Sequence, residues 1–286
     1  MTIVLGTRGS LLALAQARLV ADRIEGGVEI RAVRTAGDHS DRPLRELGDG
    51  VFVTGLEDAL RSGEIDVAVH SLKDVPTEER GDLTIAAIPQ RADPRDALIT
   101  GSRGGLASLR AGGVVGTSSP RREAFLRALR PDALTREIRG NVGTRLSKVA
   151  GGDYDATILA CAGLRRIGVD VAEEEILDGM EWPAAPGQAA LAVQCRTDDR
   201  ELRSRLSLLD HEPSRLAVTA ERALLRSLGG SCAIPLGAWA RIDGTAIAMD
   251  AALAFPDGVV RVSVRGPDPF AVAAAAAREL GQPAHA

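Results

Sequence analysis

Apolar positions along the first ninety residues change between two spacings, which predicts strands and helices in alternation. Short runs rich in Val and Ile are typical of buried strands, and longer segments with helical spacing of apolar residues are typical of helices. The predicted elements, in order, are a strand at residues 3–5, a helix at 11–24, a strand at 28–33, a helix at 51–60 and a strand at 65–69. This order favours a mainly parallel sheet in an α/β domain. Ser10 is placed to cap the first helix, and residues 35–50 predict a long mobile loop.

The same pattern restarts after residues 91–96, a charged segment that contains Pro94 and that we interpret as a hinge. The elements predicted beyond it are a strand at 114–116, a helix start at 117–120 with its helix at 121–129, a helix from 139 through 148 and a strand at 156–160. Pro120 suits the first helical position. Residues 182–188, rich in Pro and Gly, precede an apolar run, and they predict that the chain returns to the first domain.

From His211 on, a helix is followed by strands. The predicted elements are a helix at 216–228, strands at 234–242, 247–253 and 259–264, and a last helix at roughly 269–280. Turns at Asp243-Gly244 and Asp257-Gly258 indicate antiparallel pairing, so this part is expected to be a small α+β domain. We therefore predict three domains, at residues 1–90 with 188–208, at 91–187 and at 209–286.

Composition narrows the class of function. Aromatic residues make up only 2% of the 286 residues, which argues against recognition of single-stranded nucleic acid by base stacking. A net charge of −4 gives no general attraction to nucleic acid or acidic membranes. No apolar run reaches the length of a membrane span, and the start of the chain lacks the pattern of a signal peptide, so the cytoplasm is the expected location. Three cysteines without CxxC spacing indicate neither a disulfide framework nor a zinc site.

Polar side chains follow the strand at 65–69. Pro76 disfavours a helix before it, so His70 to Asp74 should form a loop at the carboxyl end of the strand. In an open α/β sheet that edge is where ligands bind. Only two of the 35 Lys and Arg residues are lysine, so Lys73 beside Asp74 stands out as a compact point charge. A surface ion pair is the alternative interpretation.

Arginines recur near the predicted strand ends and helix starts of both α/β domains. They are Arg8, Arg121, Arg122, Arg139 and Arg145. Helix N-termini and guanidinium groups together bind anions, so several such sites predict a ligand with several carboxylates or phosphates. No Walker or GxGxxG pattern supports a phosphate-loop enzyme. For any single arginine, a solvated surface position is the alternative.

Histidine and cysteine patterns exclude some chemistry and single out one thiol. The four histidines do not form a metal pattern, and a lone histidine after a strand, such as His70, is more often packed and hydrogen-bonded than catalytic. No GxSxG nucleophile elbow is present. Cys161 and Cys195 sit in apolar runs, where inert buried thiols are expected. Cys232 instead follows Gly229-Gly230-Ser231, in a loop expected to be open, which indicates use or covalent protection.

Together these motifs resemble those of the porphobilinogen deaminase (hydroxymethylbilane synthase) family. The matching segments are residues 7–10 with Gln16, 70–76, 93–96, 115–119 with Arg121-Arg122, 139–146, 186–188, 219–222 and 229–235. They occur in order along most of the chain. Two departures occur, because residues 48–55 lack the lysines usual there, and Leu72 stands where methionine is common. The resemblance therefore implies no lysine role for residues 48–55 in holding the growing product.

The resemblance implies a fold and an activity. The implied fold is α/β, with two periplasmic-binding-protein-like α/β domains forming a cleft and a small C-terminal α+β domain. The implied activity is that of a transferase that condenses four porphobilinogen molecules into hydroxymethylbilane with release of ammonia, in tetrapyrrole biosynthesis. The implied cofactor is a dipyrromethane attached to Cys232, and no metal is required. The expected partner is porphobilinogen, with no nucleic acid and no membrane, and the expected state is a monomer.

The resemblance also implies roles for individual residues. Those implied for the cofactor are Cys232 (a covalent thioether), Lys73, Ser71, Thr117, Ser118, Ser119, Arg121 and Arg122. Those implied for the substrate are Arg8, Ser10, Gln16, Arg139, Asn141, Arg145 and Gln188. Asp74 is the catalytic candidate, because a carboxylate lowers the energy of the cationic, azafulvene-like pyrrole left when ammonia departs. The alternative function is a non-catalytic, two-lobed binding protein for a polycarboxylate or another anion.

Overall fold

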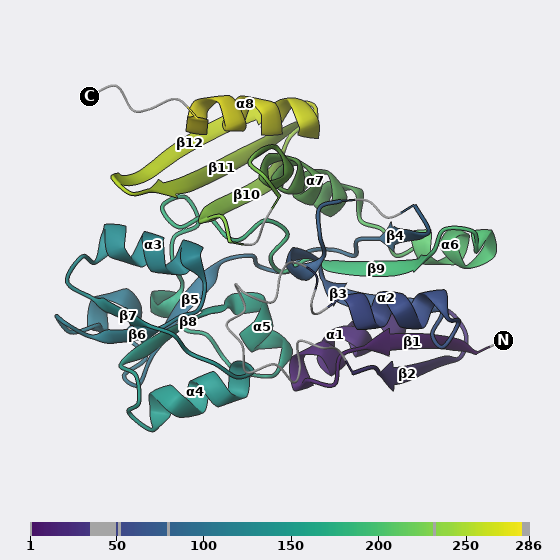
Figure 1. Ribbon diagram of the computed structural model, residues 1–286, viewed down its shortest axis with the longest axis horizontal. Helices are drawn as coiled ribbons and strands as arrows, with labels where there is room; N and C mark the ends of the chain where they lie inside the picture. Colours follow the sequence, from purple (N-terminus) through teal and green to yellow (C-terminus); the bar gives the residue numbers. More distant parts are fainter. Residues whose placement is uncertain (1, 35–49, 51–52, 79–80, 231–232, 282–286) are drawn as a thin grey trace. The chain divides into compact units, whose positions relative to one another are not determined.

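The chain forms two compact units in the computed structural model, which describes residues 2–34, 50, 53–78, 81–230 and 233–281 (Figure 1). Unit 1 contains Met1–Ala92 and Ala189–Leu216, and unit 2 contains Asp93–Gln188 and Ala217–Ala286. One boundary falls within the predicted hinge at 91–96, and the other follows the predicted return segment at 182–188. The finer division into three domains stays a prediction.

Unit 1 is a five-stranded sheet with helices. Its elements are β1 (Ile3–Thr7), α1 (Leu11–Ala21), β2 (Val28–Ala32), α2 (Thr54–Arg61), β3 (Val67–Ser71), the 3₁₀ turn η3 (Leu72–Asp74), β4 (Leu83–Ala87), β9 (Leu191–Arg196) and α6 (Arg200–Ser207). The strand order is β2-β1-β3-β9-β4. Val67 and Val69 pack with Ala17 of α1 on one face of β3, and Ala68 packs with Leu56 of α2 on the other. Because both faces are covered, β3 is apolar on both sides.

The predicted mainly parallel sheet is confirmed, because β2, β1, β3 and β4 run in the same direction, while β9 runs antiparallel to both β3 and β4. Two other expectations for unit 1 are wrong in detail. His70 and Ser71 lie in β3 rather than in a loop, because β9 continues the pairing as far as Ser71 opposite Leu191. The first helix ends at Ala21 instead of residue 24. The predicted loop at 35–50 lies almost wholly outside the described residues.

Unit 2 begins with a four-stranded sheet. Its elements are β5 (Asp96–Thr100), η4 (Gly105–Ser108), β6 (Val114–Gly116), α3 (Pro120–Leu129), β7 (Leu134–Arg136), α4 (Val142–Ala150), β8 (Ala156–Ala160), α5 (Cys161–Arg166) and η5 (Glu173–Glu175). The order is β5-β8-β6-β7, with β6 parallel to β7 and β8, and β5 antiparallel to β8. The predicted strands β6 and β8 are confirmed, whereas β5 and β7 were missed. Asp96 is the first residue of β5 and not part of a flexible hinge.

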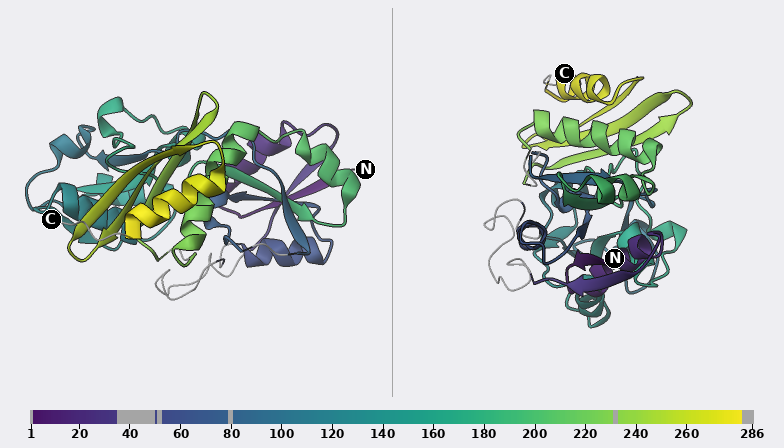
Figure 2. Two further views of the ribbon diagram at one scale, coloured as in Figure 1. Left: turned by 90° about the horizontal axis from the view of Figure 1, so that it is seen from above. Right: turned by 90° about the vertical axis from the view of Figure 1, so that its right-hand side faces the viewer.

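The C-terminal part of unit 2 is an antiparallel meander with helices. It comprises α7 (Glu212–Ser227, which starts in unit 1), β10 (Leu236–Asp243), β11 (Ala246–Phe255), β12 (Gly258–Gly266) and α8 (Pro269–Gly281). Both predicted turns are confirmed, since Asp243 pairs with Ala246 and Phe255 with Gly258. Helix α8 lies along one face of this sheet, against β11 and β12 (Figures 1 and 2). Ala252 of β11 shares an apolar cluster with Phe125 of α3.

Both α/β sheets follow one plan. In each, a central strand has a parallel partner on either side, and the next strand is an antiparallel one, β9 in unit 1 and β5 in unit 2. The predicted fold class, α/β with a small additional α+β part, is confirmed.

Candidate active site

A cavity of about 120 Å³ in unit 1 lies beside the carboxyl ends of β1 and β3. Its polar lining comes from Arg8, Ser10, Gln16, His70, Ser71, Lys73 and Asp74. Six of these seven are site residues implied by the sequence motifs, and the structure brings them together within one unit. The seventh, His70, was expected to be only a packed residue.

Local backbone structure places these side chains. Ser10 caps α1, with its Oγ accepting from the N–H of Ala13 at 3.2 Å, as the sequence predicts. Further along α1, the Gln16 amide lies 3.0 Å from the hydroxyl of Ser71. After Ser71 the backbone tightens into η3, where the Val75 N–H donates to the Leu72 carbonyl at 3.1 Å. This turn ends β3, and the two residues that follow Leu72 in it, Lys73 and Asp74, line the cavity.

Asp74 contributes to this cavity a carboxyl group whose pKa is shifted from its usual value. Its side chain is partly buried, and burial raises the pKa of the Asp74 carboxyl above its usual value, while Lys73 and Arg8 oppose that shift. A carboxylate held by opposing influences of this kind is characteristic of functional sites. It can stabilise a neighbouring positive charge in a partly desolvated setting.

His70 is buried and neutral at pH 7. Its Nε2 lies 3.0 Å from Oε1 of Gln194, and burial lowers the pKa of the imidazole to about 4. Hydrogen bonding to Gln194 acts in the opposite direction and is outweighed. The structure agrees with the expectation of a packed, hydrogen-bonded histidine, yet it also places His70 in the lining of the cavity.

Unit 2 holds a group of three arginines, in which Arg122 is paired with Asp96 and Arg139 with Glu137, while Arg145 has no acidic partner among the described residues. Burial, and to a smaller extent the like charges of Arg122 and Arg139, together lower the pKa of Arg145 to about 10. Arg145 donates from Nε to the Gly140 carbonyl at 2.9 Å, and Arg139 contacts Glu137 at 3.0 Å. Carboxylates brought to this group would relieve the repulsion, so it fits a polycarboxylate ligand.

Short polar side chains hold the two helix starts beside these arginines. Ser119 caps α3 and Asn141 caps α4, each accepting a backbone N–H three residues on, and Pro120 occupies the first turn of α3 as predicted. Thr117 Oγ1 accepts the N–H of Ser119 at 3.2 Å, and Ser118 donates to the Ile138 carbonyl at 2.7 Å. The hydroxyls predicted for cofactor binding therefore also fix these loops.

A fully buried carboxylate, Asp96, organises the rest of the predicted set and was missed by sequence reasoning. It accepts from Arg121 Nη2 at 2.6 Å, Arg122 Nη2 at 2.7 Å, Gln188 Nε2 at 2.8 Å and Trp182 Nε1 at 3.0 Å. The two arginines hold the pKa of Asp96 far below its usual range despite burial. The only sequence signal was its place in the Asp-Pro-Arg-Asp segment at 93–96.

The cofactor roles of Arg121 and Arg122 and the substrate role of Gln188 stay predictions. Cys232 lies outside the described residues.

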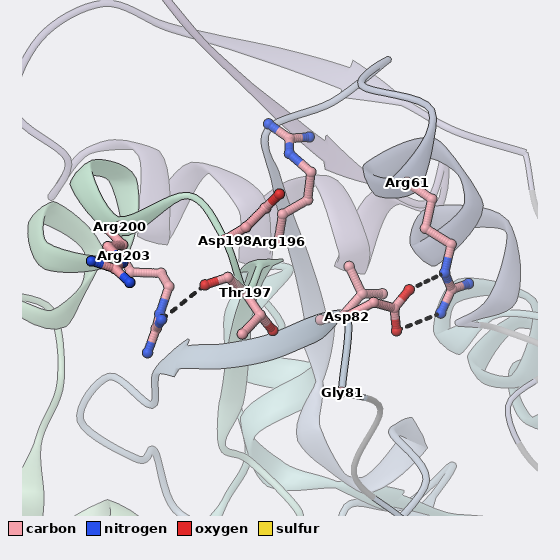
Figure 3. Close-up of a pocket in the computed structure, with 9 residues that line it drawn as sticks. Arg61, Gly81, Asp82, Arg196, Thr197, Asp198, Arg200 and Arg203 are labelled. Carbon is pink, nitrogen blue, oxygen red and sulfur yellow. Dashed lines mark hydrogen bonds and ion pairs between the residues drawn. The ribbon is translucent and has the colours of Figure 1, made fainter.

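A larger depression in unit 1, of about 770 Å³, does not have the features of a reactive site. Figure 3 shows Arg61 directed at Asp82 and Arg203 directed at the Thr197 carbonyl, while Arg196 and Arg200 point elsewhere. Its cations thus do not converge on one point. Within the described ranges, no three His, Cys, Asp or Glu side chains are grouped to hold a metal ion.

Fold and site together define a class: an α/β protein of two compact units, with a perturbed carboxyl group in a cavity of unit 1 and a group of arginines at helix starts of unit 2. The family described as "Porphobilinogen deaminase, dipyromethane cofactor binding domain" matches residues 3–204, and "Porphobilinogen deaminase, C-terminal domain" matches residues 215–285. The chain belongs to the porphobilinogen deaminase family.

Relatives named porphobilinogen deaminase are similar over most of their length. The protein from Roseiflexus sp. (strain RS-1) is 45% identical over 98% of this chain and 95% of its own. The one from Acidothermus cellulolyticus is 49% identical over 89% of this chain and 80% of its own. The one from Thermus thermophilus is 45% identical over 92% of this chain and 89% of its own.

Solved structures show only a distant likeness. A periplasmic binding protein of an ABC transporter from Brucella ovis, with glutathione bound, has a TM-score of 0.43 at 14% identity, over 79% of this chain and 68% of its own. YhfZ from Shigella flexneri has a TM-score of 0.39 at 16% identity, over 79% of this chain and 90% of its own. In the part of the chain that the structure describes, no helix is both long and apolar enough to span a membrane.

Proposed function

We propose that this chain is a transferase that condenses four porphobilinogen molecules head to tail into hydroxymethylbilane and releases one ammonia at each condensation. Family membership supports the reaction, and one structural observation supports its location. Asp74, with a raised pKa, lines a cavity together with Lys73 and Arg8, at the end of the strand that contains the family's motif.

The residues of unit 2 fit the family's dipyrromethane cofactor. Its two pyrrole rings carry carboxylates, and the mutual repulsion of Arg122, Arg139 and Arg145 is what such groups would relieve. When bound, the dipyrromethane supplies the pyrrole carbon to which the first substrate ring is joined. Attachment at Cys232 is supported by the other two thiols, because burial raises the pKa of Cys161 to about 12 and that of Cys195 to about 11. Those two thiols are poor nucleophiles near neutral pH.

Asp74 is the residue we propose to act on the reacting ring. Loss of ammonia from the aminomethyl group of porphobilinogen leaves a positive charge on the pyrrole. A nearby ionised carboxylate lowers the energy of that cation and accepts a hydrogen bond from the pyrrole N–H. Lys73 and Arg8 keep the Asp74 carboxyl more ionised than burial alone would allow. The same two cations line the cavity with Ser10 and Gln16, which supports a role for these four residues in binding acetate or propionate groups.

We further propose a cytoplasmic monomer that needs no nucleic acid, membrane or metal. The net charge of −4 and the scarcity of aromatic residues support the absence of a nucleic-acid partner. Porphobilinogen is then the partner that the site must recognise.

Purified protein incubated with porphobilinogen tests the function directly. We expect consumption of porphobilinogen, release of four ammonia molecules per linear tetrapyrrole formed, and product identified by mass. Tight binding of porphobilinogen without ammonia release would instead support a non-catalytic binding protein. Absence of both binding and turnover by cofactor-loaded protein would overturn the proposal.

A further inference from the structure

A line of buried polar side chains leads from the Asp74 cavity into the layer between the unit 1 sheet and α2. His70 on β3 contacts Gln194 on β9 through Nε2 and Oε1 at 3.0 Å. Gln194 in turn donates from Nε2 to Oε1 of Glu57 on α2 at 3.5 Å. All three side chains are at most 5% exposed. Three elements of unit 1 therefore hold one imidazole ring in place.

This line of contacts determines which ring nitrogen of His70 carries the proton. A carboxylate only accepts, so Glu57 turns the NH₂ of the Gln194 amide toward itself and leaves the amide oxygen facing His70. That oxygen also only accepts, so Nε2 of His70 must donate. In a neutral imidazole the other nitrogen, Nδ1, then carries a lone pair.

The lone pair on Nδ1 is left for a ligand. No side chain or backbone group among the described residues hydrogen-bonds Nδ1, and His70 lines the same cavity as Asp74. An imidazole in this form offers an acceptor to an N–H donor. Porphobilinogen brings two kinds of N–H donor, the pyrrole nitrogen and the aminomethyl group.

We infer that Nδ1 of neutral His70 accepts a hydrogen bond from the aminomethyl ammonium group of the substrate and so orients the bond that breaks. The inference rests on the proposed function and assigns the pyrrole N–H to Asp74. The C–N bond breaks with both electrons going to nitrogen, the ammonium leaves as neutral ammonia, and the positive charge stays on the ring. His70 takes up no proton, which agrees with its burial and with the nearby Arg8.

Two substitutions test the roles of the two ring nitrogens of His70 separately. His70→Gln retains a polar atom near the position of Nε2, where it can still contact Gln194, but removes the acceptor at Nδ1. His70→Asn retains an acceptor near the position of Nδ1 and loses the Nε2 contact. We expect kcat/KM for porphobilinogen to fall about 10- to 100-fold in His70→Gln, the range for loss of a hydrogen bond to a charged group, and to recover in part in His70→Asn. His211→Gln, in the same unit but outside this cavity, is the matched control and should be unchanged.

Two further measurements distinguish this role from a structural one. A pyrrole identical to porphobilinogen but with methyl in place of aminomethyl should inhibit wild type and His70→Gln equally well, because it lacks the group that His70 contacts. Nitrogen NMR of the cofactor-loaded protein should show His70 as the neutral tautomer with the proton on Nε2. Equal weakening of substrate and methyl analogue, a proton on Nδ1, or undiminished turnover by His70→Gln would overturn the inference. Turnover absent even in wild type would refute the proposed function instead.

Discussion

Asp96 and Arg122 form a buried two-point ion pair, with Nη2 to Oδ1 at 2.7 Å and Nε to Oδ2 at 3.3 Å. Asp96 is fully shielded from solvent, and it joins β5 to the start of α3. Arg122 is also one of the two cations that lower the pKa of Arg145. The ion pair thus holds one edge of the arginine group in position by compensating part of its charge.

Removing the charge of Asp96 should destabilise unit 2. Asp96→Asn leaves two buried guanidinium groups without their counter-ion, and we expect the free energy of unfolding at pH 7 to fall by about 3–5 kcal/mol. The folded-state pKa of Asp96 is lowered, so its contribution is present above the unfolded pKa, near 4, and is lost as pH falls below it. The difference between variant and wild type should therefore shrink in acid. Urea unfolding followed by tryptophan fluorescence measures this, because Trp182 donates to Asp96.

The control for Asp96→Asn is Asp132→Asn, which removes an exposed partner of Arg130 and should leave stability unchanged. Equal stability of Asp96→Asn and wild type would show that the buried cluster does not stabilise the fold.

Asp74→Asn should abolish most turnover while the fold stays intact. The amide keeps the shape of the side chain but cannot compensate a developing cation, and loss of one such electrostatic group lowers the rate by about 10²-fold or more. Asp74→Glu keeps the charge with displaced geometry and should be less damaging. Initial rates of ammonia release, with circular dichroism as a check of folding, decide this. Near-normal turnover by Asp74→Asn would remove Asp74 from the mechanism.

The pH dependence of turnover should report the environment of Asp74. Because burial raises the pKa of Asp74, the acid limb of the kcat profile should lie above the ordinary aspartate value of about 4. Lys73 opposes that shift, so Lys73→Gln should move the acid limb to still higher pH. Rates are compared only for protein whose mass shows the cofactor, and Arg110→Gln, an exposed arginine of unit 2, is the control. A limb that stays in place or moves to lower pH would contradict the assignment.

Arg145 should lower the thermal stability of the protein when no anion is bound near it. Arg145→Gln removes the repulsion from Arg122 and Arg139, and in a cofactor-free background made by Cys232→Ser we expect the Tm to rise by about 2–4 °C, the shift for roughly 1 kcal/mol. In cofactor-loaded protein the rise in Tm should vanish or become a fall, because the bound carboxylates then compensate the positive charge of Arg145. Arg127→Gln, exposed and paired with Glu123, should change neither Tm. A lower Tm for Arg145→Gln in both backgrounds would refute this account.

The covalent cofactor can be located by intact mass. Cys232→Ser should be inactive, less resistant to heat, and lighter than the native protein by the dipyrromethane, since a bound group that contacts only the folded state stabilises it. Cys161→Ser and Cys195→Ser should retain the added mass, because both thiols are buried. An active native chain at its bare sequence mass would rule out the covalent primer.

Local motifs predicted the parts of the site that depend on adjacent residues. The cap at Ser10, the position of Pro120 in the first turn of α3 and the two hairpin turns could all be predicted from residues close in sequence. The burial of Asp96 was not, because its donors lie between 25 and 92 positions away and an aspartate after Pro-Arg looks like surface. The sequence places His70 in a loop for a similar reason. Only pairing with β9, more than a hundred residues later, extends β3 to include it.

The position of β9 sets an order of events during synthesis. Among the described strands of unit 1, β4 pairs only with β9, so of these strands the first 92 residues emerging from a ribosome can pair β2, β1 and β3 alone. The sheet of residues 96–160 has all its strands in one continuous stretch, and it can be complete before Leu191–Arg196 is made. The sheet of unit 1, whose first strands are translated earliest, is therefore the later of the two α/β sheets to be completed. Until β9 is made, the exposed edge of β3 must stay unpaired or be protected by a chaperone.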